Sequence, residues 1–198
     1  GEWMSPLIYL NKKTQFKPFQ TTLNELSGMY NAVKAEDLDG DGDIDIVLGN
    51  QGLNAPYQAT NQHPIKLYIS DFDNNGTVEQ IMTQTINGKD IPIHLKKELT
   101  SQLPFLKKQN IKFSEYATKS IDQLFNKEIL SKADIKEVNQ FASLVAYNEG
   151  DGKFNVQELP GRVQLSCICS IETYDFNNDG IKDLILGGNN YNLKPQFS

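Results

Sequence analysis

Three nine-residue segments carry the side chains that are best placed to do chemistry. They are residues 37–45 (loop 1), 71–79 (loop 2) and 175–183 (loop 3). Each has an oxygen-bearing side chain at its first, third, fifth and ninth positions and a glycine at its sixth. Carboxylates at alternate positions can point inward together if the chain curls, and glycine tolerates the positive φ of a sharp bend. The three segments therefore predict oxygen-lined bends.

Such bends suit a hard cation, because Ca²⁺ takes about six to eight oxygen ligands. The seventh residue of each segment would add its backbone carbonyl, and the ninth would add the last carboxylate. The predicted ligands are Asp37, Asp39, Asp41, Asp43 and Asp45 in loop 1, Asp71, Asp73, Asn75, Thr77 and Glu79 in loop 2, and Asp175, Asn177, Asp179, Ile181 and Asp183 in loop 3. Loop 1 has the most carboxylates, so we expect it to bind most tightly.

Two other interpretations fit these segments less well. An EF-hand needs a glutamate at position 12, where this chain has Leu48, Met82 and Leu186. A plain hairpin turn also uses Asp-Gly and Asn-Gly pairs, but three copies with the same five positions filled favour the ion. Mg²⁺ and Mn²⁺ stay open as alternatives, although Mg²⁺ rarely uses an all-protein cage. The predicted cofactor is up to three Ca²⁺.

Strands must position these bends. Apolar runs follow loops 1 and 3, at 46–49 and 184–187. A second motif, Leu7 to Asn11 followed by Phe16, resembles Leu144 to Asn148 followed by Phe154. Asn11 precedes Asp37 by 26 residues, and Asn148 precedes Asp175 by 27. The two motifs therefore recur together, which predicts a repeated unit of strand, turn, strand, strand, acidic loop, strand.

An interruption separates loops 2 and 3. Between about Ile93 and Gln140, Lys, Glu, Gln and Leu replace glycine. Leu95, Leu99, Leu103 and Leu106 form a helical stripe that Pro104 should kink or shorten. Ser114 offers the N-cap of a second helix ahead of Tyr116, Ile121, Leu124 and Phe125, and a third helix is expected at 127–130. The predicted organisation is propeller repeats at 1–92, a helical insertion at 93–140 and a further repeat at 141–198.

The repeats resemble a known family. Asp-x-Asp-x-Asp-Gly-x-x-Asp before an apolar strand and glycine, as in residues 30–54, is similar to the FG-GAP/VCBS repeats of integrin-α-like β-propellers, in a form common in secreted Bacteroidetes proteins. The resemblance covers most of the chain except the helical insertion. It implies an all-β propeller of about seven four-stranded blades. Since the chain holds about three blades' worth of motifs, we expect a fragment whose propeller is completed by the rest of the parent polypeptide.

Composition narrows the functional classes. The chain has 25 acidic and 19 basic residues, a net charge of −6 and a single arginine, Arg162, which makes nucleic acid an unsuitable partner. No apolar run approaches the roughly 18 residues of a membrane-spanning helix. We expect an exported protein, periplasmic, cell-surface or extracellular, because millimolar Ca²⁺ outside the cytoplasm suits sites of modest affinity.

Two functions follow from this composition and these motifs. In the first, structural Ca²⁺ supports a module that binds a protein or a glycan. In the second, the chain is part of a polysaccharide-degrading enzyme of lyase or glycosidase type. The acidic and histidine candidates for that chemistry form no spaced pair, so catalysis is the weaker interpretation: Glu25, Glu36, Asp90, Glu98, Glu115, Asp122, Glu172, His63 and His94.

Aromatic and cysteine residues have ordinary expected roles. Trp3, Tyr30, Tyr57 and Tyr68 could stack on sugars, but core packing is the commoner role. Cys167 and Cys169 are two residues apart, so on a strand they would share one face, where the geometry disfavours a disulfide. We expect them to be small buried residues.

Overall fold

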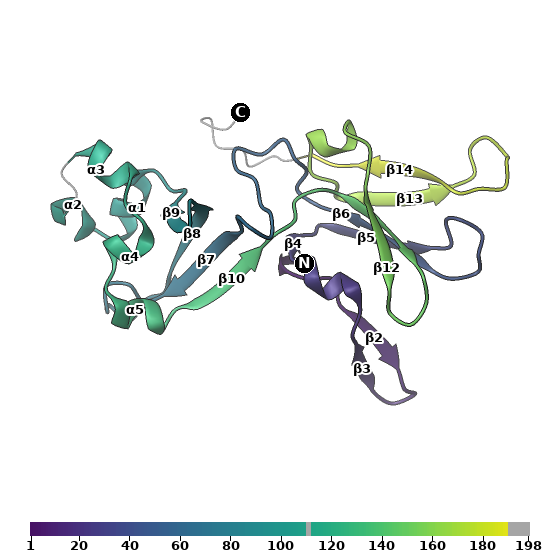
Figure 1. Cartoon of the computed structure of the whole chain (residues 1–198), viewed down its shortest axis with the longest axis horizontal. Helices are drawn as coiled ribbons and strands as arrows, with labels where there is room; N and C mark the ends of the chain where they lie inside the picture. The colour runs from purple at the N-terminus through teal and green to yellow at the C-terminus, as the bar shows by residue number, and fades with distance from the viewer. Residues whose placement is uncertain (110–111, 190–198) are drawn as a thin grey trace. The chain divides into compact units, whose positions relative to one another are not determined.

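The computed structural model describes residues 1–109 and 112–189 (Figure 1). Its chain divides into two compact units. Unit 1 comprises residues 1–58 and 140–198, and unit 2 comprises residues 59–139. Loops 1 and 3 therefore belong to unit 1 and loop 2 to unit 2, so loop 2 is grouped with the helices rather than with loop 1.

Unit 1 is built from antiparallel strand pairs. Its largest sheet, the core sheet, has the order β12 (Phe154–Glu158), β11 (Leu144–Asn148), β6 (Asp45–Gly49) and β5 (Ala32–Glu36). Three two-stranded sheets accompany it. They pair β1 (Glu2–Met4) with β4 (Gly28–Met29), β2 (Ile8–Asn11) with β3 (Phe16–Phe19), and β13 (Ser170–Tyr174) with β14 (Asp183–Gly187). Short 3₁₀ helices lie at η1 (Thr22–Glu25) and η2 (Val163–Leu165).

The repeated order of elements is confirmed in unit 1. The first copy runs through β2, β3, β5 and β6, and the second through β11, β12, β13 and β14. The core sheet combines the two copies, because β6 of the first pairs with β11 of the second. One face of the core sheet packs on the β13–β14 pair, where Val47 and Val145 share a core cluster with Ile168, Ile171, Leu184 and Leu186.

Unit 2 has its own sheet and the helices. The strand order is β10 (Asp134–Val138), β7 (Ile65–Ser70), β8 (Glu79–Ile86) and β9 (Lys89–Pro92), all antiparallel. The helices are α1 (Lys96–Gln102), α2 (Leu106–Gln109), α3 (Phe113–Ala117), α4 (Ile121–Leu124) and α5 (Lys127–Ser131). Leu99, Leu103 and Leu106 are fully buried in one cluster with Tyr68, Phe72 and Ile81 of the sheet side. The helical segment thus covers a face of this sheet.

Several details of the helical prediction need correction. Leu95 is 52% exposed, because it sits at the N-cap of α1 rather than on its buried stripe. The second helix begins at Phe113, before Ser114, and a separate helix α4 begins after Ser120. The Gln123 side chain accepts a hydrogen bond from the Ser120 amide at 3.1 Å, which satisfies a donor at that new helix start.

The predicted helical range also contains a strand. Residues Asp134–Val138 pair along β7, from Asp134 beside Ile69 to Val138 beside Ile65. The composition of this segment favours a helix, but the segment forms a strand because it pairs with the edge of β7. The third helix is found where it was expected, and the Asn126 side chain caps it by accepting from the Ile129 amide at 2.9 Å. Among the described residues the chain is thus mostly β, with open antiparallel sheets and with its α-helices confined to residues 96–131.

Candidate metal centres

The three acidic loops fold in the same way. In each, the carboxylate at position 1 accepts a hydrogen bond from the backbone N–H of the position-6 glycine. The bonds are Gly42 to Asp37 at 3.1 Å, Gly76 to Asp71 at 2.9 Å and Gly180 to Asp175 at 2.9 Å. Because each bond spans five residues, it closes the loop into a compact bend. Loops 1 and 3 each join the two strands of a hairpin and project from unit 1 in the same direction (Figure 1).

A second repeated bond ties each loop to its own base. The carboxylate at position 9 accepts from the backbone N–H of position 2, at the start of the loop. These bonds are Leu38 to Asp45 at 2.9 Å, Phe72 to Glu79 at 3.0 Å and Phe176 to Asp183 at 2.9 Å. Asp45 and Glu79 are buried, with 1% and 9% exposure. The position-9 residue therefore anchors the loop in the strands.

The backbone turns to the left-handed region at two positions of every loop. The position-6 glycines, as predicted, have φ between 86° and 93°. Position 4 is also left-handed, with φ of 80° at Gly40, 56° at Asn74 and 59° at Asn178. Asn and Gly are the residues that enter this region most readily. Sequence reasoning missed position 4, although the choice of Gly, Asn and Asn there was the available signal.

Two of the loops bring three carboxylates together. Asp37, Asp39 and Asp45 in loop 1 each offer an oxygen within 4.8 Å of the others, as do Asp71, Asp73 and Glu79 in loop 2. These two clusters could hold a metal ion. Like charges this close repel one another, and a divalent cation turns that repulsion into attraction.

Loop 2 contains a further indication that a ligand belongs there. The Oδ1 atom of Asp73 is buried and has no hydrogen-bond partner. A buried carboxylate oxygen without a partner is unfavourable, and a bound cation would satisfy it. Four backbone N–H groups, led by that of Gly76, lower the pKa of Asp71 and so favour its charged form.

The structure brings together only part of each predicted ligand set. Positions 1, 3 and 9 converge in loops 1 and 2, whereas the position-5 oxygen accepts from the backbone N–H of position 7. That bond joins Asp43 to Asp41 at 2.8 Å and Thr77 to Asn75 at 2.7 Å. Both clusters therefore have three carboxylates. The number of clustered carboxylates consequently gives no reason to expect tighter ion binding at loop 1 than at loop 2.

Loop 3 differs in its chemistry. Within the described part of the chain it forms no cluster of three acidic side chains, because position 3 is Asn177. The Asn177 amide donates to Asp179 Oδ2 at 2.8 Å, and Asp179 Oδ1 accepts from the Ile181 N–H at 2.8 Å. Asp183 is only half-buried. Loop 3 thus has the same backbone bend with a less acidic interior.

Loop 1 is also joined to the second copy of the repeat. The N–H of Asn148 donates to Asp45 Oδ1 at 2.9 Å, and its side-chain amide donates to the Ile44 carbonyl at 3.3 Å. Asp45 therefore accepts one bond from its own loop and one from the end of β11. The asparagine of the companion motif, which the sequence marked only as a repeated residue, holds the acidic loop against the neighbouring hairpin.

Most carboxylates and histidines considered for catalysis have structural partners. Asp90 accepts from Tyr68 and Thr85, both at 2.6 Å, and from Lys66 at 3.1 Å. Burial raises the pKa of Asp90, but these bonds outweigh burial and lower it overall. Glu98 accepts from the Leu95 amide at the start of α1, and His94 Nε2 accepts from the Met82 amide.

Two further carboxylates considered for catalysis, and two of the aromatic residues considered for sugar stacking, also have structural contacts. Glu172 pairs with Lys34 at 2.9 Å, and Glu36 accepts from the Thr173 hydroxyl at 3.2 Å. Tyr30 and Tyr68 are each 6% exposed, which confirms core packing for those two aromatic residues.

The two cysteines do not lie on a strand. Residues 167–169 are irregular, and the Cys167 and Cys169 sulfurs are 3.7 Å apart. The expectation that they share one face of a strand is therefore wrong, because backbone bonds from Ile168 to Asn50 and from Cys169 to Gly187 fix a different path. The expectation that both are small buried residues is confirmed for Cys167, which is buried, and wrong for Cys169, which is exposed.

The thiols should differ in reactivity. Burial, together with the neighbouring Cys169 thiol, raises the pKa of Cys167, so less of it is the reactive thiolate. We expect iodoacetamide to modify Cys169 about tenfold faster than Cys167, measured by fragment-ion mass spectrometry of the tryptic peptide 163–182, which contains both residues. The control is the unfolded chain in guanidinium, in which the two rates should converge. Equal rates in the folded protein would contradict the assignment of Cys167 to the interior.

Comparison with protein-family models, with curated proteins and with solved structures finds no match. No helix in the described ranges is long and apolar enough to cross a membrane.

Proposed function

We propose that this chain is a calcium-binding β-module of the FG-GAP/VCBS propeller type, from an exported protein, in which Ca²⁺ has a structural role. The observation that carries the proposal is the shared loop design: two bends with clustered carboxylates, each anchored by a buried ninth residue. The ligand atoms are all oxygen, which suits Ca²⁺ rather than a softer metal. The ion would hold the two strands of each hairpin together at the loop.

A binding role for the whole module follows from the same design. Ions that stiffen the loops would fix the positions of neighbouring hairpins, and repeat proteins use such arrays to present an extended surface. We propose that this surface binds a protein or a glycan. Binding is preferred to catalysis because several of the carboxylates considered for catalysis make structural contacts, among them Asp90 and Glu98.

Calcium should stabilise the folded chain. An ion that binds only the folded state adds about 2.7 kcal/mol per site when its concentration is a hundred times the dissociation constant. We therefore expect EDTA to lower the melting temperature by several degrees and excess Ca²⁺ to restore it, as measured by differential scanning calorimetry. Isothermal titration should give two sites, in loops 1 and 2, with loop 3 weaker.

Two controls sharpen this test. Mg²⁺ at the same concentration should restore much less of the melting temperature, because it needs a near-octahedral shell and releases its waters reluctantly. Asp73→Asn should remove the loop 2 site alone, while Asp122→Asn changes an exposed carboxylate outside the loops and should leave both sites intact. A melting temperature that neither EDTA nor Ca²⁺ moves, together with no binding heat, would refute the proposal.

A further inference from the structure

The core sheet shows how the two repeated hairpins join. Strand β6, which follows loop 1, pairs antiparallel with β11, so that Leu48 lies beside Leu144, Val47 beside Val145 and Ile46 beside Ala146. The bonds from Asn148 to Asp45 and Ile44 close the end of this pairing. An acidic-loop hairpin and an apolar–Asn hairpin thus form one four-stranded sheet.

The same two kinds of hairpin occur once more in unit 1, but they are not joined. The β2–β3 pair carries the apolar–Asn motif, with Asn11 beside Phe16 as Asn148 is beside Phe154. The β13–β14 pair carries loop 3. Within the described residues β2 pairs only with β3, and β14 only with β13. Each therefore presents the edge that its counterpart uses in the core sheet.

The exposed fractions of side chains at equivalent positions of the two repeat copies show which apolar side chains lack a covering partner. Val33 and Ile171 both lie four residues before their acidic loops, yet Val33 is 69% exposed and Ile171 is 7% exposed. Ile185 of β14 is 52% exposed, whereas its counterpart Val47 of β6 is fully buried. Large apolar side chains on strands at matching repeat positions are covered in one copy and open in the other.

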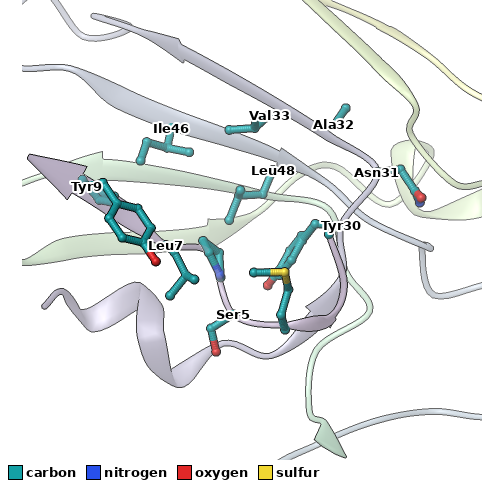
Figure 2. Close-up of a pocket in the computed structure, with 13 residues that line it drawn as sticks. Ser5, Leu7, Tyr9, Tyr30, Asn31, Ala32, Val33, Ile46 and Leu48 are labelled. Atoms are coloured by element: carbon teal, nitrogen blue, oxygen red, sulfur yellow. The ribbon is translucent and has the colours of Figure 1, made fainter. Parts of the chain in front are cut away.

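A cavity marks the uncovered face. It measures about 380 Å³ and lies between the segment around β2 and the core sheet, with Ile8, Val33, Ile46 and Leu48 among the residues in its wall. Figure 2 shows Val33, Ile46 and Leu48 on the core-sheet side of it. On the opposite face of the core sheet, Val47 packs with Leu184 and Leu186, the counterparts of Ile46 and Leu48. The cavity thus lies against Ile46 and Leu48, at the place where the Val47-equivalent residue of another acidic-loop hairpin would pack.

We propose that the β13–β14 hairpin of a second copy of this chain adds to the edge of β2. The register of the core sheet places Leu186 of the second copy beside Leu7, Ile185 beside Ile8 and Leu184 beside Tyr9. The Ile185 side chain then enters the cavity beside Ile46 and Leu48. Asn11 caps loop 3 at Asp183 of the second copy, as Asn148 caps loop 1 at Asp45.

A second copy is the occupant because this one chain carries both complementary edges. The contact is head-to-tail, so each copy uses β2 toward one neighbour and β14 toward the next. Such contacts build rings or open chains rather than two-fold dimers. The interaction does not depend on the calcium proposal, since it rests on strand pairing and apolar burial.

Sedimentation equilibrium of the whole chain tests this interface. The mass should rise with concentration in steps of 22.3 kDa. Ile185→Asp should weaken association at least tenfold, because it places a carboxylate in the apolar cavity. Ile135→Asp is the matched control, since it makes the same change at an exposed residue of unit 2 and should leave association unchanged. A chain that stays monomeric at every concentration would overturn the proposal and assign these edges to a different polypeptide.

A cross-linking experiment tests the register without relying on a disruptive variant. In a background with Cys167→Ser and Cys169→Ser, chains carrying Ile8→Cys are mixed with chains carrying Ile185→Cys and mildly oxidised. Disulfide-linked heterodimers are expected. The control mixture pairs Tyr9→Cys with Ile185→Cys, whose side chains point to opposite faces in this register. No heterodimer, or equal yields from the two mixtures, would exclude the proposed pairing.

Discussion

Replacing Asp45 with alanine should lower the free energy of unfolding of unit 1 by about 3 kcal/mol and abolish ion binding at loop 1. Asp45 is 1% exposed and accepts hydrogen bonds from Leu38 and Asn148. Alanine leaves the buried Leu38 N–H and the half-buried Asn148 N–H without that acceptor, and it removes one of the three clustered carboxylates. Denaturant titration with EDTA present isolates the hydrogen-bonding part, and the same titration in Ca²⁺ adds the ion's contribution.

Two further variants separate these contributions. Asp45→Asn keeps a side-chain acceptor at the same place, so in EDTA it should lose less stability than alanine while still losing the ion. Asp43→Ala changes an exposed carboxylate of the same loop that lies outside the cluster, and we expect a change of less than about 0.5 kcal/mol. If Asp43→Ala and Asp45→Ala were equally damaging, the ninth position would not be the anchor of the loop.

The second large effect concerns Asn50, which no sequence pattern marked. This side chain is completely buried and makes four hydrogen bonds. Its Oδ1 accepts from the Met29 and Gln51 amides at 3.1 and 2.8 Å, and its Nδ2 donates to the Gln140 and Ala142 carbonyls at 2.9 and 3.2 Å. Asn50→Ala should reduce the free energy of unfolding by about 4 kcal/mol, because it leaves several buried polar groups unpaired.

A second substitution at Asn50 tests its hydrogen bonds more specifically. Asn50→Asp keeps the shape but directs a carboxylate at two carbonyl oxygens, so we expect it to be at least as damaging as alanine. Asn54→Ala is the matched control, because Asn54 is exposed and donates a single bond to the Leu165 carbonyl; its loss should stay below about 1 kcal/mol. Circular dichroism during urea unfolding measures all three. Similar losses for Asn50→Ala and Asn54→Ala would show that the buried amide is not a centre of unit 1.

A buried network explains why Asn50 matters. Its own backbone N–H donates to the Ser143 hydroxyl at 3.0 Å, and the Ser143 N–H donates to Gln164 Oε1 at 2.8 Å. Gln164 in turn donates to the Ser143 and Leu159 carbonyls, both at 2.9 Å. Three segments that are far apart in the chain are thereby joined through fully satisfied polar contacts, the arrangement in which removing one member is most harmful.

Local patterns in the sequence were enough to locate the acidic loops, their glycines and the order of strands around them. This works because side-chain spacing and backbone freedom act over a few residues. The same reasoning found the buried Leu99, Leu103 and Leu106 and a helix at 127–130, which in the structure spans Lys127–Ser131. It failed at residues 134–138, where composition suggested a helix and the edge of β7 imposed a strand.

Tertiary structure alone decided which residues meet across the chain. Asn148 reaches Asp45 from 103 residues away, and Asn50 meets Ala142 from 92. The sequence marks Asp45 as acidic and Asn148 as repeated, but their contact depends on β6 pairing with β11, which follows from burial and strand register rather than from local spacing. For the same reason, the motifs alone could not show that, within residues 1–109 and 112–189, β2 and β14 each have one strand partner while β6 and β11 also pair with each other.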